Sequence, residues 1–476
     1  MKLGKLSLIA ALAISTSAYA SDATDSIKFD GQLKLWYQTM DHEGVSNGKS
    51  DKGLFSRDTN QPNEWGNVEA QIGVSGQAND HIKYRVAAMT VTTLGMDQMV
   101  TVGQTARPSQ FGASNGYDAQ PFWIHEAYID YKVAANTSIK VGRMELDTPL
   151  AYTEKWNATA NSFEAIVAVN TDLPDTTVVG AWVAKGNGAT DNLVYAPQVF
   201  GAESTYYDYM GLKHDADGDG VNDLDNDGGA LALGVINNSV SFMPLQAWGY
   251  LIPDVGRAFW LQADASVKDL GPVNKASLQL IGASIGTSGD TQSYLDNITD
   301  TKDTTAVAAK VSMNAGMFGA YAAFSAIGEG NLPVANTATN YKKTKLPTAS
   351  IFNDGMVAAQ PDTTSFKVGA SAKFDGIGTL GLSYGSYEVG KNTGYLNPNA
   401  KVGGPASMGN IAQGLGEDIS LSEIDVVFKT KVKDVDLAAM LIMVDKTYVP
   451  ILGDADNADY GDLKNNIVRL VATLKF

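Results

Sequence analysis

The last eleven residues, Asn466–Phe476 (NIVRLVATLKF), place an apolar side chain at every second position. The apolar set is Val468, Leu470, Ala472, Leu474 and Phe476, and the residues between them include Arg469, Thr473 and Lys475. Because successive side chains of a strand point to opposite faces of a sheet, this pattern predicts a β-strand with one apolar and one polar face. Such a strand fits the wall of a β-barrel, and it also fits a soluble β-sandwich.

The start of the chain repeats this pattern between residues 28 and 38. One face would carry Phe29, Leu33, Leu35 and Tyr37, and the other Lys28, Asp30, Gln32, Lys34 and Gln38. A barrel that closes by pairing its first strand with its last leaves no unpaired strand edge in lipid. The two ends of the sequence therefore favour a closed barrel.

Residues 1–20 have the features of an export signal. They begin with Lys2 and Lys5, continue with the apolar run 6–14, and end on Ala18-Tyr19-Ala20, a small-x-small cleavage site. Removing them takes away two lysines and no acid, which changes the formal charge from -17 to -19. Such an acidic chain would repel nucleic acid. No later segment approaches the roughly 18 uninterrupted apolar residues of a membrane helix, and the chain contains no Cys.

Alternating segments recur along the whole of residues 21–476, and we count about eighteen of them, with sixteen as the other possibility. They lie near 27–38, 66–76, 81–91, 123–133, 137–143, 162–170, 176–185, 229–237, 240–250, 256–266, 275–285, 304–314, 316–326, 365–375, 378–389, 420–431, 434–445 and 465–476. Pro244 and Gly249 interrupt the ninth. Long connections alternate with short turns such as Ala78-Asn79-Asp80. The sequence therefore predicts an all-β transmembrane antiparallel barrel with long external loops and short periplasmic turns.

Two stretches resemble the major outer-membrane porins of campylobacter-like bacteria. They are Ile139–Leu150 (IKVGRMELDTPL) and Asn161–Ala165 (NSFEA). The resemblance implies an outer-membrane location in a Gram-negative bacterium, a homotrimer, and a terminal Phe that is presented to the assembly machinery. It also implies that the third external loop, here roughly 144–161, folds into the barrel and narrows it.

The residues around that loop support a constriction. Gly142 loosens the strand end and Pro149 stops strand pairing, so the chain leaves the wall there. Glu145, Asp147 and Glu154 would then face Lys83, Arg85, Lys140 and Arg143 across the lumen. Opposed charges across a narrow passage select solutes by charge. The alternative is that the acids only solvate an external loop.

An acidic run between residues 214 and 229 has the spacing of a calcium loop. Its candidate ligands are Asp215, Asp217, Asp219, Val221 through its carbonyl, Asp223, Asp225 and Asp227. It resembles the acidic repeats of thrombospondin type 3 and dockerin loops, but Asn226 stands at position twelve where an acid is expected. The alternative is a solvated surface run.

These features together predict a passive channel for small hydrophilic solutes and ions, with cation preference from its acidic composition. The alternative is a non-conducting barrel that acts as an adhesin or as an enzyme at its rim. The four histidines have no metal or nucleophile spacing, so we expect no enzyme. Acidic external loops would bind the divalent cations that bridge lipopolysaccharide. Trp36 and Trp260 share parity with lumen residues and would form either a sugar track or packing.

Overall fold

The structure is a computed structural model of the 476-residue chain. It describes residues 27–41, 53–55, 64–92, 99–101, 104–106, 122–155, 158–186, 204–205, 229–253, 256–289, 292–293, 302–339, 343–390, 419–450 and 460–476. The predicted export signal at residues 1–20 lies outside the described residues.

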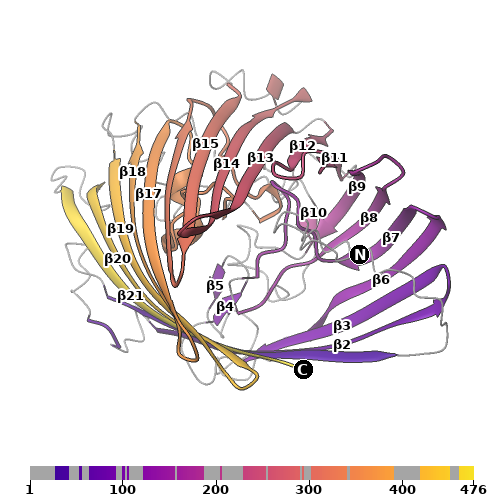
Figure 1. Ribbon diagram of the computed structural model, residues 1–476, viewed down its shortest axis with the longest axis horizontal. Helices are drawn as coiled ribbons and strands as arrows, with labels where there is room; N and C mark the ends of the chain where they lie inside the picture. The colour runs from indigo at the N-terminus through magenta and orange to yellow at the C-terminus, as the bar shows by residue number, and fades with distance from the viewer. Residues whose placement is uncertain are drawn as a thin grey trace, which may run out of the picture.

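Eighteen antiparallel strands form a closed barrel (Figure 1). In chain order they are β1 (Lys28–Met40), β2 (Glu64–Asn79), β3 (Ile82–Thr92), β6 (Phe122–Ala134), β7 (Thr137–Met144), β8 (Phe163–Asn170), β9 (Thr176–Gly186), β11 (Ala230–Asn237), β12 (Leu245–Ile252), β13 (Gly256–Leu270), β14 (Val273–Thr287), β15 (Thr304–Ala315), β16 (Phe318–Ile327), β17 (Thr363–Phe374), β18 (Gly378–Val389), β19 (Ile419–Val432), β20 (Val435–Pro450) and β21 (Tyr460–Lys475). Three short strands, β4 (Met99–Thr101), β5 (Gln104–Ala106) and β10 (Ser204–Thr205), lie outside this set.

The barrel closes where the sequence pattern predicts, between its first and last strands. β1 pairs with β21 from Gln32 opposite Lys475 to Met40 opposite Ile467. The backbone of Phe476 extends this ladder by exchanging two hydrogen bonds with Gly31, of 2.8 and 3.1 Å. No strand edge of the barrel is therefore left open at the closure.

The two faces of the wall sort as the alternation predicts. On the outside, Leu33 and Leu470 are each 44% exposed, whereas their neighbours Lys34 and Arg469 point inward and are buried. The structure extends several predicted strands by four or five residues, among them β13, β20 and β21, and it shortens the predicted strand at 240–250. That strand begins only at Leu245, because Pro244 cannot donate a ladder hydrogen bond and residues 239–244 belong to the turn.

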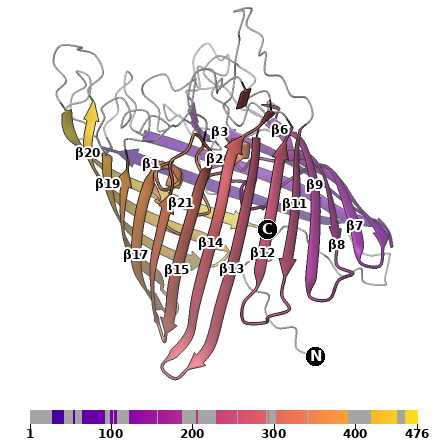
Figure 2. The ribbon, with the colours of Figure 1, turned by 90° about the horizontal axis from the view of Figure 1, so that it is seen from above.

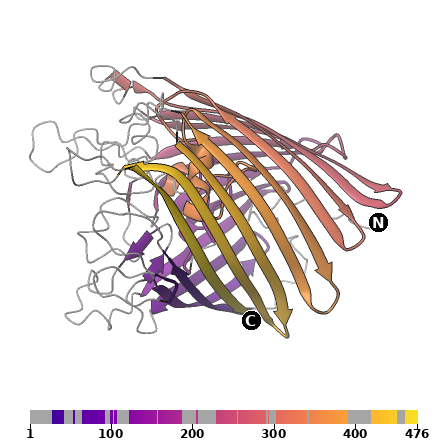
Figure 3. The same cartoon turned by 90° about the vertical axis from the view of Figure 1, so that its left-hand side faces the viewer.

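Tight hairpins gather at one end of the barrel, which is the periplasmic end by the rule for such barrels. The hairpin of β13 and β14 shows this arrangement clearly (Figures 2 and 3). Within the described part of the chain, no helix has the length and apolar character needed to cross a membrane.

Among the connections that the structure describes, two fold into the interior. One runs from β7 to β8, and the other runs from β16 to β17 and carries the short 3₁₀ helices η4 (Thr337–Thr339) and η5 (Phe352–Ala359) (Figure 1). Around the barrel, six strands separate β8 from β16, and eight separate β17 from β7. The two connections therefore start from nearly opposite walls and divide the interior into two parts.

The six-strand part is filled. Its core consists of buried apolar side chains from the wall, including Phe163 and Trp260, packed against Leu150 and Leu332 of the two connections. The other part keeps an open cavity near the periplasmic end. Among the described residues, this open space lies on the side formed by β19–β21, β1–β3 and β6–β7.

Candidate functional site

The open part of the interior holds a cavity of about 1100 Å³. Its wall comes from β1, β2, β3, β6, β7, β19, β20 and β21, and the β7–β8 connection contributes Glu145 and Lys155. Among the described residues that line it, eight are basic and five are acidic. The basic ones are Lys28, Lys34, Lys83, Arg85, Lys140, Lys155, Lys429 and Lys475, and the acidic ones are Asp30, Glu126, Asp130, Glu145 and Asp436. The cavity is therefore polar and carries both signs of charge.

Arg85 forms an ion-pair cluster with two acidic residues of this wall. Its guanidinium donates two hydrogen bonds to the Asp30 carboxylate, of 2.6 and 2.9 Å, and a third of 2.5 Å to Glu126. The three side chains come from β1, β3 and β6, three strands that are far apart in sequence but adjacent or nearly so in the wall. A bidentate pair of this kind fixes the guanidinium in one orientation at the cavity surface.

Lys83 and Lys140 also line this cavity. The Lys140 ammonium lies 4.5 Å from the centre of the Tyr128 ring, which is a cation–π distance. Three of the four predicted wall cations therefore share one cavity surface. Arg143, the fourth, does not line it. It has the parity of Val141, which is exposed on the outer face, and it bonds Glu164 at 2.9 Å.

Glu145 fixes the base of the β7–β8 connection. His125 Nε2 lies 3.1 Å from one of its carboxylate oxygens, and Lys155 of the same connection forms an ion pair with the other. Burial opposes ionisation, but the hydrogen bond from His125 and the charge of Lys155 outweigh it and lower the pKa of Glu145 to about 2. The Lys34 ammonium donates to the carbonyl of Lys155 at 2.9 Å, so β1 holds the connection as well.

Gly142 still pairs with both neighbouring strands, and the chain leaves the wall after Met144, two residues further on. Gly142 has φ 128°, and a Cβ there would lie 2.2 Å from the carbonyl oxygen of Ala127. No residue with a side chain fits this conformation. Beyond it, residues 146–153 form a small hairpin in which Thr153 N–H donates to Leu146 C=O at 2.7 Å.

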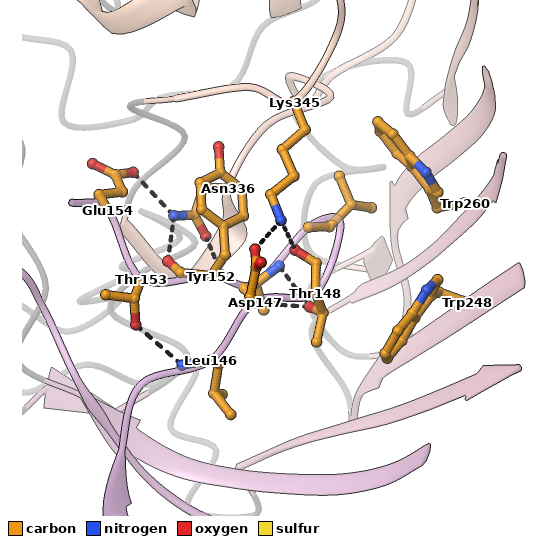
Figure 4. A network of polar contacts seen from close by, with 12 residues as sticks. Leu146, Asp147, Thr148, Tyr152, Thr153, Glu154, Trp248, Trp260, Asn336 and Lys345 are labelled. Carbon is orange, nitrogen blue, oxygen red and sulfur yellow. Dashed lines mark hydrogen bonds and ion pairs between the residues drawn. The ribbon is translucent and has the colours of Figure 1, made fainter. Parts of the chain in front are cut away.

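The two other predicted acids, Asp147 on this hairpin and Glu154 directly after it, meet the β16–β17 connection (Figure 4). Asp147 forms an ion pair with Lys345, and Glu154, which is 1% exposed, accepts a 3.0 Å hydrogen bond from Asn336. The sequence placed both acids in the constricting segment, and the structure brings that segment inside the barrel. Their partners, however, come from the β16–β17 connection and not from the predicted wall cations.

The two tryptophans with lumen parity are packing residues. Trp36 is 1% exposed and lies under the guanidinium of Arg469, and Trp260 is fully buried in the filled part. Neither can offer its ring face to a passing sugar. The sequence had left this alternative open, and the structure decides it.

Several site residues were missed by sequence reasoning. They are Asp30, Glu126, His125 and Lys155, and also the β16–β17 connection as a whole. That connection does carry a signal, because Leu332, Val334 and Ala335 form an apolar run that an external loop has no reason to contain. The sequence carried no comparable signal for the partners of Arg85, because only the pairing of the strands brings Asp30 and Glu126 next to it.

The predicted calcium ligands Asp215, Asp217, Asp219, Val221, Asp223, Asp225 and Asp227 lie outside the described residues. Within the part of the chain that the structure describes, no group of three or more His, Asp or Glu side chains could hold a metal ion.

Residues 1–342 match the profile of a family described as Campylobacter major outer membrane protein. The chain belongs to this family. This porin is thus an outer-membrane protein of Gram-negative bacteria, and its family and fold point to a channel without enzymatic activity. The resemblance seen in the sequence is confirmed. A comparison with curated proteins found no match.

Solved structures of other porins share the fold. The structure of Pseudomonas aeruginosa OccD3 (OpdP) has a TM-score of 0.62 at 12% identity and covers 96% of this chain and 92% of its own. Acinetobacter baumannii OccAB4 has a TM-score of 0.64 at 10% identity, with 94% and 98% covered. Pseudomonas aeruginosa OpdK, solved with vanillate, has a TM-score of 0.62 at 12% identity, with 94% and 98% covered. At these identities the likeness concerns the fold alone.

Proposed function

We propose that this porin is a passive, water-filled channel for small hydrophilic solutes and ions. The observation that carries the proposal is the polar cavity on one side of a closed barrel of eighteen strands. Barrels of this size are wide enough to hold an aqueous passage, which side chains and inward loops then narrow. The filled part of the interior cannot conduct, so the solute path runs along β19–β21, β1–β3 and β6–β7.

Conductance in a planar lipid bilayer tests this function. The purified, folded barrel should insert and give stepwise current increases of uniform size. Heat-denatured protein is the matched control and should give none. A correctly folded barrel that inserts without conducting would instead support the non-conducting alternative, in which the external loops act as an adhesin or carry an enzyme at the rim.

Cation preference remains a prediction. Its support is the acid excess of the whole chain, which has 52 acidic and 35 basic residues. The cavity lining opposes cation preference, because it contains eight basic and five acidic residues. In addition, Glu145 and Asp147 are both paired with lysines. A reversal potential in a low-salt gradient measures which effect is larger, because screening is then weakest. A potential of the sign for anions would show that the lining dominates.

We also propose that the run 214–229 binds calcium, on the strength of its sequence alone. Calcium that binds only the folded state should raise the melting temperature as its concentration rises. Replacing Asp217 and Asp219 by Asn keeps side-chain size and removes two charged ligands. If calcium shifts the melting temperature of this variant as much as that of the parent, the run is only a solvated surface.

The assembly and its lipid partners are further proposals. The family resemblance supports a homotrimer, and the acidic loop sequences support divalent-cation bridges to lipopolysaccharide. Cross-linking in native outer membranes should give a trimer, and chelation of divalent cations should release bound lipopolysaccharide from the purified protein. A monomer after cross-linking would contradict the first proposal.

A further inference from the structure

The tip of the β7–β8 connection is a hairpin that cannot satisfy all of its own backbone groups. Asp147 and Tyr152 form its single bridge, and Thr148 N–H donates to Ala151 C=O at 3.1 Å. The N–H and C=O of Tyr152 and the C=O of Leu150 bond groups of the β16–β17 connection. The tip therefore depends for its position on a segment that starts from the far wall.

Asn336 takes the place of a neighbouring strand beside Tyr152 (Figure 4). The backbone N–H of Tyr152 donates to Asn336 Oδ1 at 3.2 Å, and Asn336 Nδ2 donates to the Tyr152 C=O at 2.9 Å. The second Nδ2 proton goes to the Glu154 carboxylate at 3.0 Å. Only a side-chain amide supplies both an acceptor and two donors at this length.

Burial makes these contacts costly to lose. Asn336 is fully buried, Tyr152 is 4% exposed, and Glu154 is 1% exposed. A buried backbone group or carboxylate that loses its partner must either bear the desolvation penalty or move to water. Without the amide, the hairpin tip would gain by moving away from its present position.

Neighbouring residues reinforce the same contact. Both the backbone N–H and the hydroxyl of Thr337 donate to the Leu150 C=O, at 2.9 and 2.8 Å. Lys345 donates to the Thr148 C=O at 2.9 Å and pairs with Asp147. The two connections are thus joined along the whole of the tip.

The segment that carries Asn336 is itself anchored to the wall. The backbone N–H of Asn336 donates to the Lys343 C=O at 2.7 Å and joins the two ends of the stretch 336–343. Further along, the hydroxyls of Thr348 and Ser325 lie 2.6 Å apart, and the Tyr387 hydroxyl donates to the Thr348 C=O at 2.9 Å. Because β16 and β18 hold this segment, it can serve as a fixed support.

From this geometry we propose that Asn336 is the positioning residue of the constriction. It holds the tip of the β7–β8 connection from the opposite wall, so that two connections together set the smallest section of the channel. The inference rests on the proposed channel function. It predicts that the size limit for solutes depends on a residue that does not line the cavity.

Asn336→Ala is the direct test, with Asn237→Ala as the matched control. Asn237 also uses its amide to bond a neighbouring strand, Thr176 Oγ1 at 2.8 Å, but it lies at the hairpin end. In planar bilayers, Asn336→Ala should show additional conductance levels above that of the parent. Polyethylene glycols of graded size, which are neutral, should enter the variant at sizes that the parent excludes. The control should match the parent in both readouts.

A pair of charge variants keeps the test specific. Asn336→Asp removes both donors and sets a carboxylate against Glu154, so it should add conductance levels at least as strongly as Asn336→Ala. Adding Glu154→Gln restores a donor to that contact and should move the size limit back toward the parent. Equal behaviour of the single and double variants would overturn the positioning role.

Folding is checked by the mobility of unheated samples on denaturing gels, where closed barrels migrate differently from unfolded chains. Should Asn336→Ala not fold, Thr337→Val removes only one hydroxyl donor and should give the same change more weakly. A folded variant with the conductance, noise and size limit of the parent would overturn the inference. A parent that does not conduct would instead overturn the proposed function.

Discussion

The two parts of the barrel interior differ although one kind of strand builds both. Along β8–β16 the inward side chains are mostly apolar, as in Phe163, and two inward connections bury them. Along β19–β21, β1–β3 and β6–β7 they include Arg85 and Lys140, and the space in front of them stays open. The outer faces of both parts carry exposed apolar residues such as Ile166 and Leu470. The comparison teaches that the inward set of side chains decides where the barrel is a core and where it is a passage.

The largest expected effect is a difference in the free energy of unfolding between substitutions in the filled part and in the open part. Phe163→Ala removes a fully buried ring from the filled part and should lower the free energy of unfolding by about 3–5 kcal/mol. Phe163→Leu keeps most of the volume and should cost less than about 1.5 kcal/mol. Lys83→Ala on the cavity wall should cost less than about 1 kcal/mol. Urea titration of the protein in vesicles measures all three, and equal losses at residues 163 and 83 would contradict the division.

The second prediction concerns the point where the β7–β8 connection leaves the wall. The pKa of Glu145 falls from 4.5 to about 2 in the folded protein. The stabilisation by this carboxylate is then complete above pH 4.5 and is lost as the pH falls through 2. It amounts to at most about 3 kcal/mol, from the difference in pKa.

Parent and Glu145→Gln should therefore differ in free energy of unfolding by a constant amount between pH 7 and pH 5, and the difference should shrink below pH 4.5. Urea titrations over this range measure it. Asp172→Asn at the hairpin end provides the exposed control, and it should show a much smaller difference. A difference that vanishes above pH 5 would mean that the ion pair with Lys155 does not hold the connection.

The smallest expected effect is on charge selectivity in the open part. Arg85→Gln removes one positive charge and leaves Asp30 and Glu126 without their guanidinium partner. One charge acting at ~10 Å in water amounts to about 0.4 kcal/mol, roughly a factor of two for each ion and of opposite sign for cations and anions, so the ratio of cation to anion permeability should rise roughly fourfold. Reversal potentials at low salt measure the ratio. Arg143→Gln, on the outer face, is the control and should leave it unchanged.

The sequence alone determined the wall. The period of two in Asn466–Phe476 and in β1 predicts which side chains meet lipid, and the alternation of long connections with tight turns predicts about eighteen strands, the number that the structure has. The sequence also distinguishes strands that line the filled interior. In β8 (FEAIVAVN) the inward side chains Phe163, Ala165, Val167 and Val169 are all apolar, whereas in β3 the inner face begins with Lys83 and Arg85. The face of the wall that each side chain occupies is a local property, because successive residues of a strand alternate between the two faces.

Only the tertiary structure determines which side chains from distant segments contact one another. Gly142 and Pro149 predicted that the chain leaves the wall near residue 144. They gave no indication that Asn336 and Lys345 are the partners of that segment. More than 180 residues separate Asn336 from Tyr152, and barrel closure brings them together. From the sequence alone, the loop acids are paired with wall cations only because their charges are opposite. In the folded chain Asp147 and Glu154 bind donors of the β16–β17 connection, and Glu145 binds His125 of β6 and Lys155 of its own connection. No local sequence pattern encodes these contacts.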